Sequence, residues 1–102
     1  MTLQMEKRVV LTVITESAIE KTLLRDFKRL GVRGYTIVDA RGQGRRGVRT
    51  AAMDESANIR IEVICTRALA ESVLEDFLAR YYDNFAMVAY LQDIEIIRPD
   101  KF

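Results

Sequence analysis

Residues 58–65 read NIRIEVIC, and one of the two alternating phases of this stretch is wholly apolar. That phase consists of Ile59, Ile61, Val63 and Cys65. The other phase consists of Arg60, Glu62 and Ile64. Because side chains along a β-strand point alternately to opposite faces, this pattern predicts a strand over residues 58–65 with one buried face.

The chain on either side of this strand alternates between strand-like and helix-like patterns. Residues 8–14 (RVVLTVI), 34–40 (GYTIVDA) and 86–97 are rich in β-branched and aliphatic side chains, which predicts three further strands, the last ending before Pro99. Apolar residues recur at helical spacing between the first two of these strands: Ile19, Leu23, Leu24, Phe27 and Leu30. A second helical stripe follows residue 65: Leu69, Val73, Leu74, Phe77, Leu78 and Tyr81.

Three short signals mark the predicted helix ends. Ser17, with Glu20 three residues later, forms a capping box at the start of the first helix. Gly31 suits the C-terminal cap of that helix. Thr66 is suited to cap the N-terminus of the second helix.

The predicted element order is βαββαβ. Two helices on one face of a four-stranded antiparallel sheet give a ferredoxin-like fold of the α+β class, and residues 1–102 form a single domain. The other face of the sheet would present a largely apolar set: Val10, Thr12, Ile14, Thr36, Val38 and Ile64. A patch of this kind is unfavourable in water, which predicts a homo-oligomer packed through that face.

Composition excludes several classes of function. The 102 residues carry a net charge of +1, so no overall field favours nucleic acid or an anionic membrane. The sequence contains no histidine, which removes catalysis by Ser-His-Asp or Cys-His and the commonest ligand of transition metals. The single cysteine excludes an internal disulfide and fits a reducing compartment. No apolar run is long enough for a signal peptide or a membrane span, so we expect a cytoplasmic protein. Because no catalytic constellation is visible in the sequence, we expect no enzymatic activity.

The segment between the predicted second and third strands, residues 42–57, has little apolar pattern and is predicted as one long loop. The stretch that opens it, Arg41–Arg49, reads RGQGRRGVR and combines four arginines with three glycines. Glycine allows tight turns and close approach of backbone N–H groups to a ligand, and arginine supplies planar charged forks for phosphate or carboxylate oxygens. The loop therefore has the composition of an anion-binding site.

Other interpretations of this loop remain open at this point. Gly42, Gly44 and Gly47 spell GxGxxG, but no helical stripe follows, as a dinucleotide-binding fold requires. Gly42 and Gly47 also have the spacing of P-loop glycines, but Val48 and Arg49 stand where that motif has lysine and a hydroxyl residue. The arginines could equally belong to a solvated hairpin with no ligand. RNA binding is disfavoured because the strand at 58–65 has no aromatic residue on which a base could stack.

Three motifs in order along the chain resemble those of the PII signalling superfamily, in its PII-like branch. Gly34-Tyr35-Thr36 resembles the Gly-x-Thr that opens the second strand of that family and lies beside the adenine. Gly42-Gln43-Gly44-Arg45 resembles the Gly-x-Gly-Arg at the base of the family's T-loop, and Arg60–Val63 resembles the Lys-Ile-Glu-Val of its third strand. The resemblance spans nearly the whole chain and implies a homotrimer with the T-loop at about residues 42–57.

The resemblance also implies ligands and the residues that bind them. The stretch Gly44–Arg49 is similar to one in PII-like proteins tied to bicarbonate uptake and carboxysomes, which implies ADP or AMP together with bicarbonate as ligands and no metal. The implied nucleotide-binding residues are Gly34, Tyr35, Thr36, Gly42, Gly44, Arg46, Arg49, Ile64 and Arg98. The implied bicarbonate-binding residues are Gly42, Gln43, Gly44, Arg45 and Arg46.

Departures from the family pattern bear on the type of signal. Residues 83–87 (DNFAM) lack the Gly-x-Gly-Lys with which PII proteins grip nucleotide phosphates from a neighbouring subunit, which argues against the usual sensing of ATP with 2-oxoglutarate. The expected partners are therefore an adenine nucleotide, bicarbonate, and a bicarbonate transporter or carboxysome component, with no nucleic acid and with association with carboxysomes as an implied location. The alternatives are a trimeric ferredoxin-like protein for metal tolerance and a passive structural oligomer.

Overall fold

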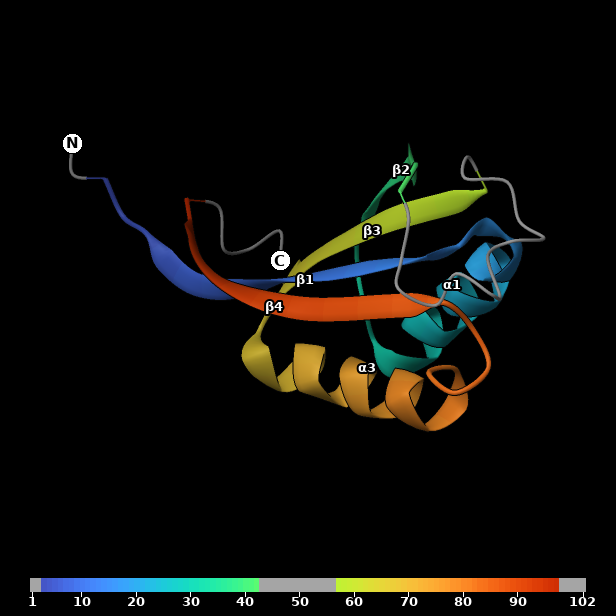
Figure 1. The fold of residues 1–102 in the computed structure, drawn as a ribbon. Coiled ribbons are helices and arrows are strands. Elements are labelled where there is room, and N and C mark those ends of the chain that lie inside the picture. The colour runs from blue at the N-terminus through green and yellow to red at the C-terminus, as the bar shows by residue number, and fades with distance from the viewer. Residues whose placement is uncertain (1–2, 43–56, 98–102) are drawn as a thin grey trace.

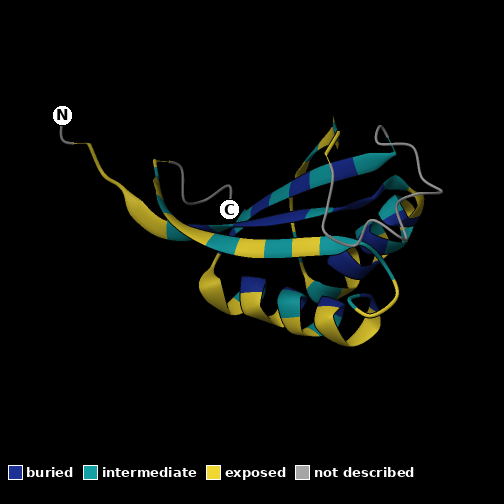
Figure 2. Ribbon diagram, in the orientation of Figure 1, coloured by how far each residue is buried: buried dark blue, intermediate teal, exposed yellow. Residues whose placement is uncertain are grey.

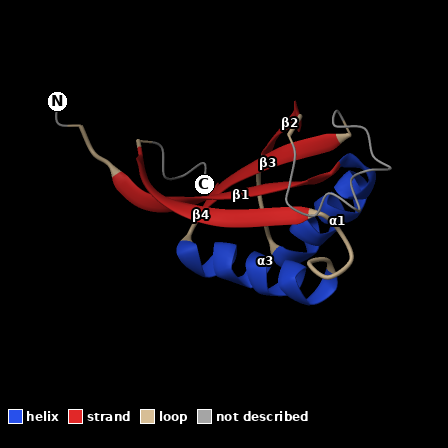
Figure 3. Ribbon diagram, viewed as in Figure 1, coloured by secondary structure: helices blue, strands red, loops and turns tan. Residues whose placement is uncertain are grey.

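The computed structural model describes residues 3–42 and 57–97 and has the predicted element order. In Figure 3 the labelled strands and helices are β1 (Glu6–Glu16), α1 (Glu20–Leu30), β2 (Thr36–Ala40), β3 (Asn58–Cys65), α3 (Arg67–Arg80) and β4 (Met87–Ile96). A short 3-10 turn, η1 (Ser17–Ile19), joins β1 to α1. The bounds of β3 are those that the alternating pattern predicts.

The four strands form one sheet in the order β2-β3-β1-β4. Each neighbouring pair is antiparallel, with Leu11 of β1 opposite Val63 of β3 on one side and Leu91 of β4 on the other. Both helices lie on the same face of the sheet (Figure 1). This arrangement confirms the ferredoxin-like α+β fold.

The hydrophobic core lies between the sheet and the helices. Along β3 the buried residues are the predicted apolar phase, and Figure 2 shows the alternation as dark blue and teal bands. The two helices meet through Phe27 of α1 and Phe77 of α3, whose rings stack with centroids 5.8 Å apart. The fully buried large side chains are Leu11, Val13, Thr12, Thr15, Leu23, Phe27, Ile59, Ile61, Val63, Val73 and Phe77.

Two of the three predicted helix caps are confirmed. Gly31 adopts φ 94° at the end of α1, in the left-handed region that glycine reaches without strain. The Thr66 hydroxyl accepts a hydrogen bond from the Leu69 N–H at 3.3 Å at the start of α3. The capping box of Ser17 and Glu20 is wrong, because Ser17 begins a 3-10 turn and its backbone N–H instead donates to the Ala57 carbonyl at 2.8 Å.

Two predictions about which side chains are exposed also need correction. Leu78 is 62% exposed, whereas Ala70 is fully buried. The buried face of α3 runs through Ala70, Val73 and Phe77, and Leu78 is rotated from Phe77 by about 100°. Thr12 lies on the open face of the sheet, as predicted, but it is not presented to solvent: it is fully buried there, between Glu62 and Tyr90 in the register.

Candidate functional site

A notch at the edge of the sheet arises because β2 and β3 differ in length. The pairing of β2 with β3 ends at Thr36 opposite Glu62, whereas β3 continues to Cys65. On this side, β2 therefore supplies no pairing partner to residues 63–65. The notch holds a cavity of about 200 Å³ whose lining is Arg33, Gly34, Val63, Ile64, Cys65, Thr66 and Leu69.

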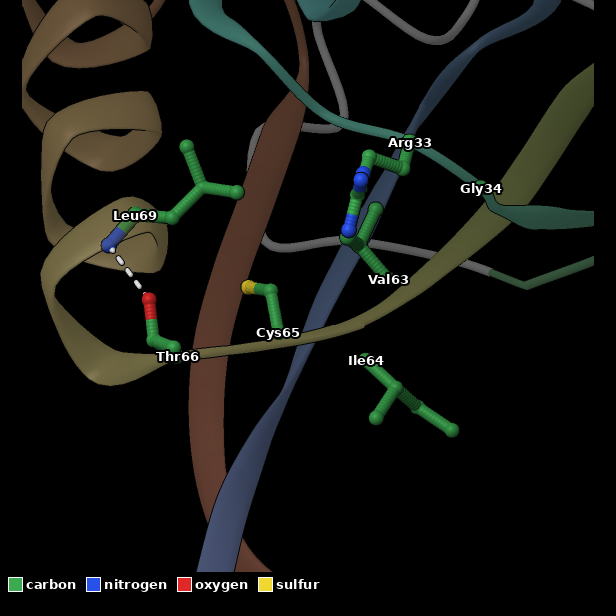
Figure 4. Close-up of a pocket in the computed structure, with 7 residues that line it drawn as sticks. All are labelled: Arg33, Gly34, Val63, Ile64, Cys65, Thr66 and Leu69. Carbon is green, nitrogen blue, oxygen red and sulfur yellow. Dashed lines mark hydrogen bonds between the residues drawn. The ribbon is translucent and has the colours of Figure 1, made fainter. Parts of the chain in front are cut away.

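The side chains around this cavity belong to two sides of β3. Figure 4 shows Val63 and Cys65 on the side of α3 and Ile64 pointing the opposite way, as strand alternation requires. Ile64 thus borders the cavity through its backbone and lends its side chain to the open face of the sheet. Gly34 borders the cavity from the segment before β2, and a Cβ added there would meet no atom within 4 Å.

The cavity walls are mostly apolar and uncharged. Burial raises the pKa of the Cys65 thiol, so this group stays protonated and neutral at physiological pH. Arg33 is exposed at the rim, and the described part of the chain gives its guanidinium no ion pair. The apolar walls lie beside the part of β3 that β2 does not pair with, and a guanidinium is nearby. Such a site suits a flat ring that has polar edges.

The structure brings three of the predicted site residues together at this notch. Gly34 and Ile64 line the same cavity, and Thr36 begins β2 beside them, exposed and opposite Glu62. Tyr35 lies between Gly34 and Thr36 in sequence but on the helix side, where its ring centroid is 5.9 Å from that of Phe27.

Gly42 lies apart from this group. It follows the end of β2, beyond the pair formed by Ala40 and Asn58. The advance along β2 from Thr36 to Ala40 is roughly 13 Å at about 3.3 Å per residue, so Gly42 and the notch lie at opposite ends of this strand.

The remaining predicted site residues lie outside the described residues. They are Gln43, Gly44, Arg45, Arg46, Arg49 and Arg98. The predicted loop at 42–57 is described only at its two ends, Gly42 and Ala57.

Sequence reasoning missed several lining residues, above all Arg33 and Leu69. The strand pattern predicts Cys65 in the core, and its side chain is 4% exposed, yet it also forms part of the cavity wall. No local sequence signal could have found these residues, because the second strand is predicted over 34–40, whereas β2 begins only at Thr36 and leaves the end of β3 without a partner on that side.

Within residues 3–42 and 57–97, no three acidic, cysteine or histidine side chains gather in a way that could hold a metal ion. Within the same ranges, no helix has the length and apolarity needed to cross a bilayer.

The chain thus combines a βαββαβ domain, a cavity at the sheet edge and a long connection between β2 and β3. The family model "Nitrogen regulatory protein P-II" matches residues 8–101. The chain therefore belongs to the P-II family and is a PII-like signalling protein of a non-enzymatic, regulatory kind.

Solved structures of PII-like proteins are similar over almost the whole chain. A PII-like signalling protein from Thermus thermophilus is 35% identical, with 97% of this chain and 98% of that chain covered and a TM-score of 0.80. CPII from Thiomonas intermedia K12, bound to ADP and bicarbonate, is 30% identical, with 99% of each chain covered and a TM-score of 0.85. CPII bound to ADP, AMP and acetate is 29% identical, with 97% of each chain covered and a TM-score of 0.81.

Proposed function

We propose that this chain is a sensor that binds an adenine nucleotide, ADP or AMP, together with bicarbonate. The observation that carries the proposal is the cavity beside Gly34 and Ile64 at the uncovered end of β3. It lies in a chain 30% identical to CPII, whose structure holds ADP and bicarbonate.

The adenine ring is assigned to the notch. Its faces would contact the apolar walls, while its polar edge would bond to backbone groups of residues 63–65, which β2 leaves uncovered. Thr36 begins β2 at this end of the strand, and its hydroxyl would bond to the base. Gly34, Tyr35, Thr36 and Ile64 form this part of the proposed site.

The phosphates and bicarbonate are assigned to the loop that begins at Gly42. Guanidinium groups form charge-assisted bonds to phosphate oxygens, each worth on the order of 1.5–3 kcal/mol. The proposed phosphate-binding residues are Gly42, Gly44, Arg46, Arg49 and Arg98. The proposed bicarbonate-binding residues are Gly42, Gln43, Gly44, Arg45 and Arg46, because an arginine fork with backbone N–H groups suits a small planar anion.

The notch and the Gly42 loop lie at opposite ends of β2, and in the proposed site each of them serves a different nucleotide. A nucleotide in a cleft between two copies could meet the notch of one copy and the Gly42 loop of another. We therefore propose a homotrimer, packed through the open face of the sheet.

The open face has features that a second copy would satisfy. Val38 and Val88 are 51% and 49% exposed there. Thr12 Oγ1 and Arg60 Nε, on the same face, are buried atoms with no hydrogen-bond partner among the described residues. Both of these atoms are already covered within one chain, whereas the exposed Val38 and Val88 form the apolar surface that a second copy would cover.

Signalling would follow from the effect of ligand on the 42–57 loop. Neutralising Arg46 and Arg49 by phosphate would hold the loop in one conformation and present a changed surface to a partner. A bicarbonate transporter or a carboxysome component stays the predicted partner. If nucleotide and bicarbonate share the loop, each must raise the affinity of the other by the same factor.

Calorimetric titration with AMP, ADP, ATP and cyclic AMP, with and without bicarbonate, tests the proposal. We expect micromolar binding of ADP or AMP that tightens when bicarbonate is present. Arg46→Ala with Arg49→Ala should weaken that binding at least tenfold, whereas Arg25→Ala on the exposed side of α1 should leave it unchanged. Nucleotide binding that ignores bicarbonate would remove the link to carbon, and absence of binding by all four nucleotides would overturn the sensor.

A further inference from the structure

The cavity at the notch has one charged side chain in its lining, that of Arg33. Among the described residues that line the cavity, Arg33 alone carries a charge, and the side chains of Val63, Cys65 and Leu69 around it are uncharged. Figure 4 shows the Arg33 side chain reaching from the segment before β2 toward β3. Such walls give a cation no favourable partner, so packing within the chain does not explain why an arginine stands here.

The Arg33 guanidinium also has no carboxylate partner in the part of the chain that the structure describes. Two other exposed arginines, Arg29 and Arg80, do have one, because their nitrogen atoms lie 2.9 Å and 3.3 Å from the carboxylate oxygens of Asp76. The flat face and the N–H donors of Arg33 are therefore available to a ligand in the cavity.

The backbone on either side of Arg33 is anchored to α1. Before it, Gly31 takes the left-handed cap conformation, and the Val32 N–H donates to the Phe27 carbonyl at 2.9 Å. After it, the Tyr35 ring lies against the ring of Phe27, with centroids 5.9 Å apart. The Arg33 side chain thus starts from a fixed position at the cavity, which lowers the entropy that a ligand must remove when it binds.

A guanidinium in this position suits the face of an aromatic base. The group is planar, holds its water more weakly than an ammonium does, and stacks on aromatic rings. Unpaired bases of nucleic acids are bound on arginine planes in this way. An adenine ring in the notch would have the apolar wall of Val63 and Leu69 on one side and would leave its other side to Arg33.

We propose that Arg33 stacks on the face of the adenine ring and holds it against the apolar wall of the notch. This inference rests on the proposed function. It adds to the proposed site a ligand-binding residue from the segment between α1 and β2, and it assigns that residue to the base and not to the phosphates. Its contribution to affinity comes from the contact of two flat groups as well as from the positive charge.

Calorimetric titration with ADP tests this role. Arg33→Ala should weaken ADP binding by about fivefold to tenfold. Arg33→Lys keeps the charge but not the plane, so it should recover only part of the loss. The loss in Arg33→Ala should differ by less than about twofold between low salt and about 0.5 M salt, because screening weakens contacts to phosphate but not stacking on an uncharged ring.

A matched control and a spectroscopic signature complete the test. Arg25→Ala, which removes an exposed arginine of α1 outside the cavity lining, should bind ADP as the parent protein does. In NMR spectra, ADP should move the Arg33 Nε–H signal upfield, because a group above an aromatic ring is shielded by the ring current. A hydrogen bond in the plane of the base would move this signal downfield instead. Arg33→Lys identifies the signal by removing it.

The possible results separate this inference from the proposed function. Full recovery in Arg33→Lys, or a loss that disappears at high salt, would make Arg33 a charge that acts on the phosphates. Unchanged ADP affinity in Arg33→Ala, or a downfield shift of the Nε–H signal, would also contradict the stack. Each of these results overturns the inference and leaves the sensor standing. If the parent protein binds no ADP, the proposed function fails and the inference fails with it.

Discussion

Substitution of Gly34 should affect ADP binding without affecting the stability of the fold. Its backbone lies outside the left-handed region, and a methyl group added there meets no atom within 4 Å. Gly34→Ala should therefore leave thermal stability unchanged. The same methyl group would occupy part of the cavity and should weaken ADP binding about tenfold, or ~1.4 kcal/mol. Thermal melting and calorimetry on the same sample measure the two effects.

Gly31 provides the opposite case three residues earlier. At φ 94° it lies in the left-handed region, so Gly31→Ala should cost about 1 kcal/mol of folding free energy. Gly31 is absent from the cavity lining, and its substitution should leave ADP affinity unchanged. Equal loss of ADP affinity in both variants would mean that the notch is not the adenine site.

Tyr81 predicts how stability changes at alkaline pH. Burial, and then the hydrogen bond from its hydroxyl to Asp26, raise the pKa of Tyr81 above its ordinary value of 10.0. In the unfolded chain the phenol loses its proton near pH 10, earlier than in the fold, so the free energy of unfolding should fall as pH rises above 10. Tyr81→Phe should reduce this slope and, because Asp26 loses a buried partner, lower stability at neutral pH by about 1 kcal/mol. Denaturant titrations between pH 8 and roughly pH 11 would measure both changes.

The comparison of Tyr81→Phe with the parent protein isolates this effect. An identical slope in Tyr81→Phe and the parent protein would show that Tyr81 does not hold its proton more tightly in the fold.

At the level of elements, alanine substitution at the starts of the two helices should change the folding stability by different amounts. Thr66 accepts the Leu69 N–H at 3.3 Å, so Thr66→Ala should cost about 1 kcal/mol. The Ser17 side chain makes no such cap bond, because the turn η1 precedes α1 and the contact to Ala57 uses the Ser17 backbone. Ser17→Ala should therefore change stability by less than about 0.5 kcal/mol. Chemical denaturation of both variants decides the comparison, and a comparable loss in Ser17→Ala would restore the capping box.

The local sequence pattern predicts which elements form. Where strands and helices begin and end also depends on pairing between residues that are distant in sequence. The bounds of β3 are correct because its alternation follows from one buried face. The pattern predicts the first strand over 8–14, but it extends over Glu6–Glu16, because its ends pair with β4 from Glu6 opposite Ile96 to Thr15 opposite Met87. The capping box at Ser17 fails for a similar reason, since Ala57, which is distant in sequence, takes the Ser17 N–H.

The candidate site can be predicted only in part. Gly34 and Ile64 come from a resemblance to a family, and the structure brings both to one cavity. Arg33 and Leu69 could not be found that way, because their place in the wall depends on where β2 stops pairing with β3. The residues of the loop after Gly42 stay predictions.

At the scale of the molecule, the two faces of the sheet differ in what covers them. One face carries both helices and the core (Figure 2). The other face carries Val38, Val88 and Tyr90, all exposed, around the ion pair of Arg60 with Glu62 at 2.9 Å. A group of exposed apolar side chains on one face of a sheet is typical of a surface that another protein chain covers.

Introducing one charge on each face of the molecule tests whether the open face of the sheet is an interface or an ordinary exposed surface. Val88→Asp places a carboxylate among the apolar residues of the open face, where a packed second copy would leave it without water. If that face forms the homotrimer, Val88→Asp should yield monomers in light scattering coupled to size exclusion and should abolish ADP binding, since the proposed cleft lies between copies.

Leu78→Asp is the matched control: Leu78 is 62% exposed against 49% for Val88, but it lies on α3. It should leave both the trimer and the ADP affinity intact. A Val88→Asp protein that stays trimeric would place the interface elsewhere, and one that becomes monomeric yet binds ADP as the parent does would place the whole nucleotide site within one copy.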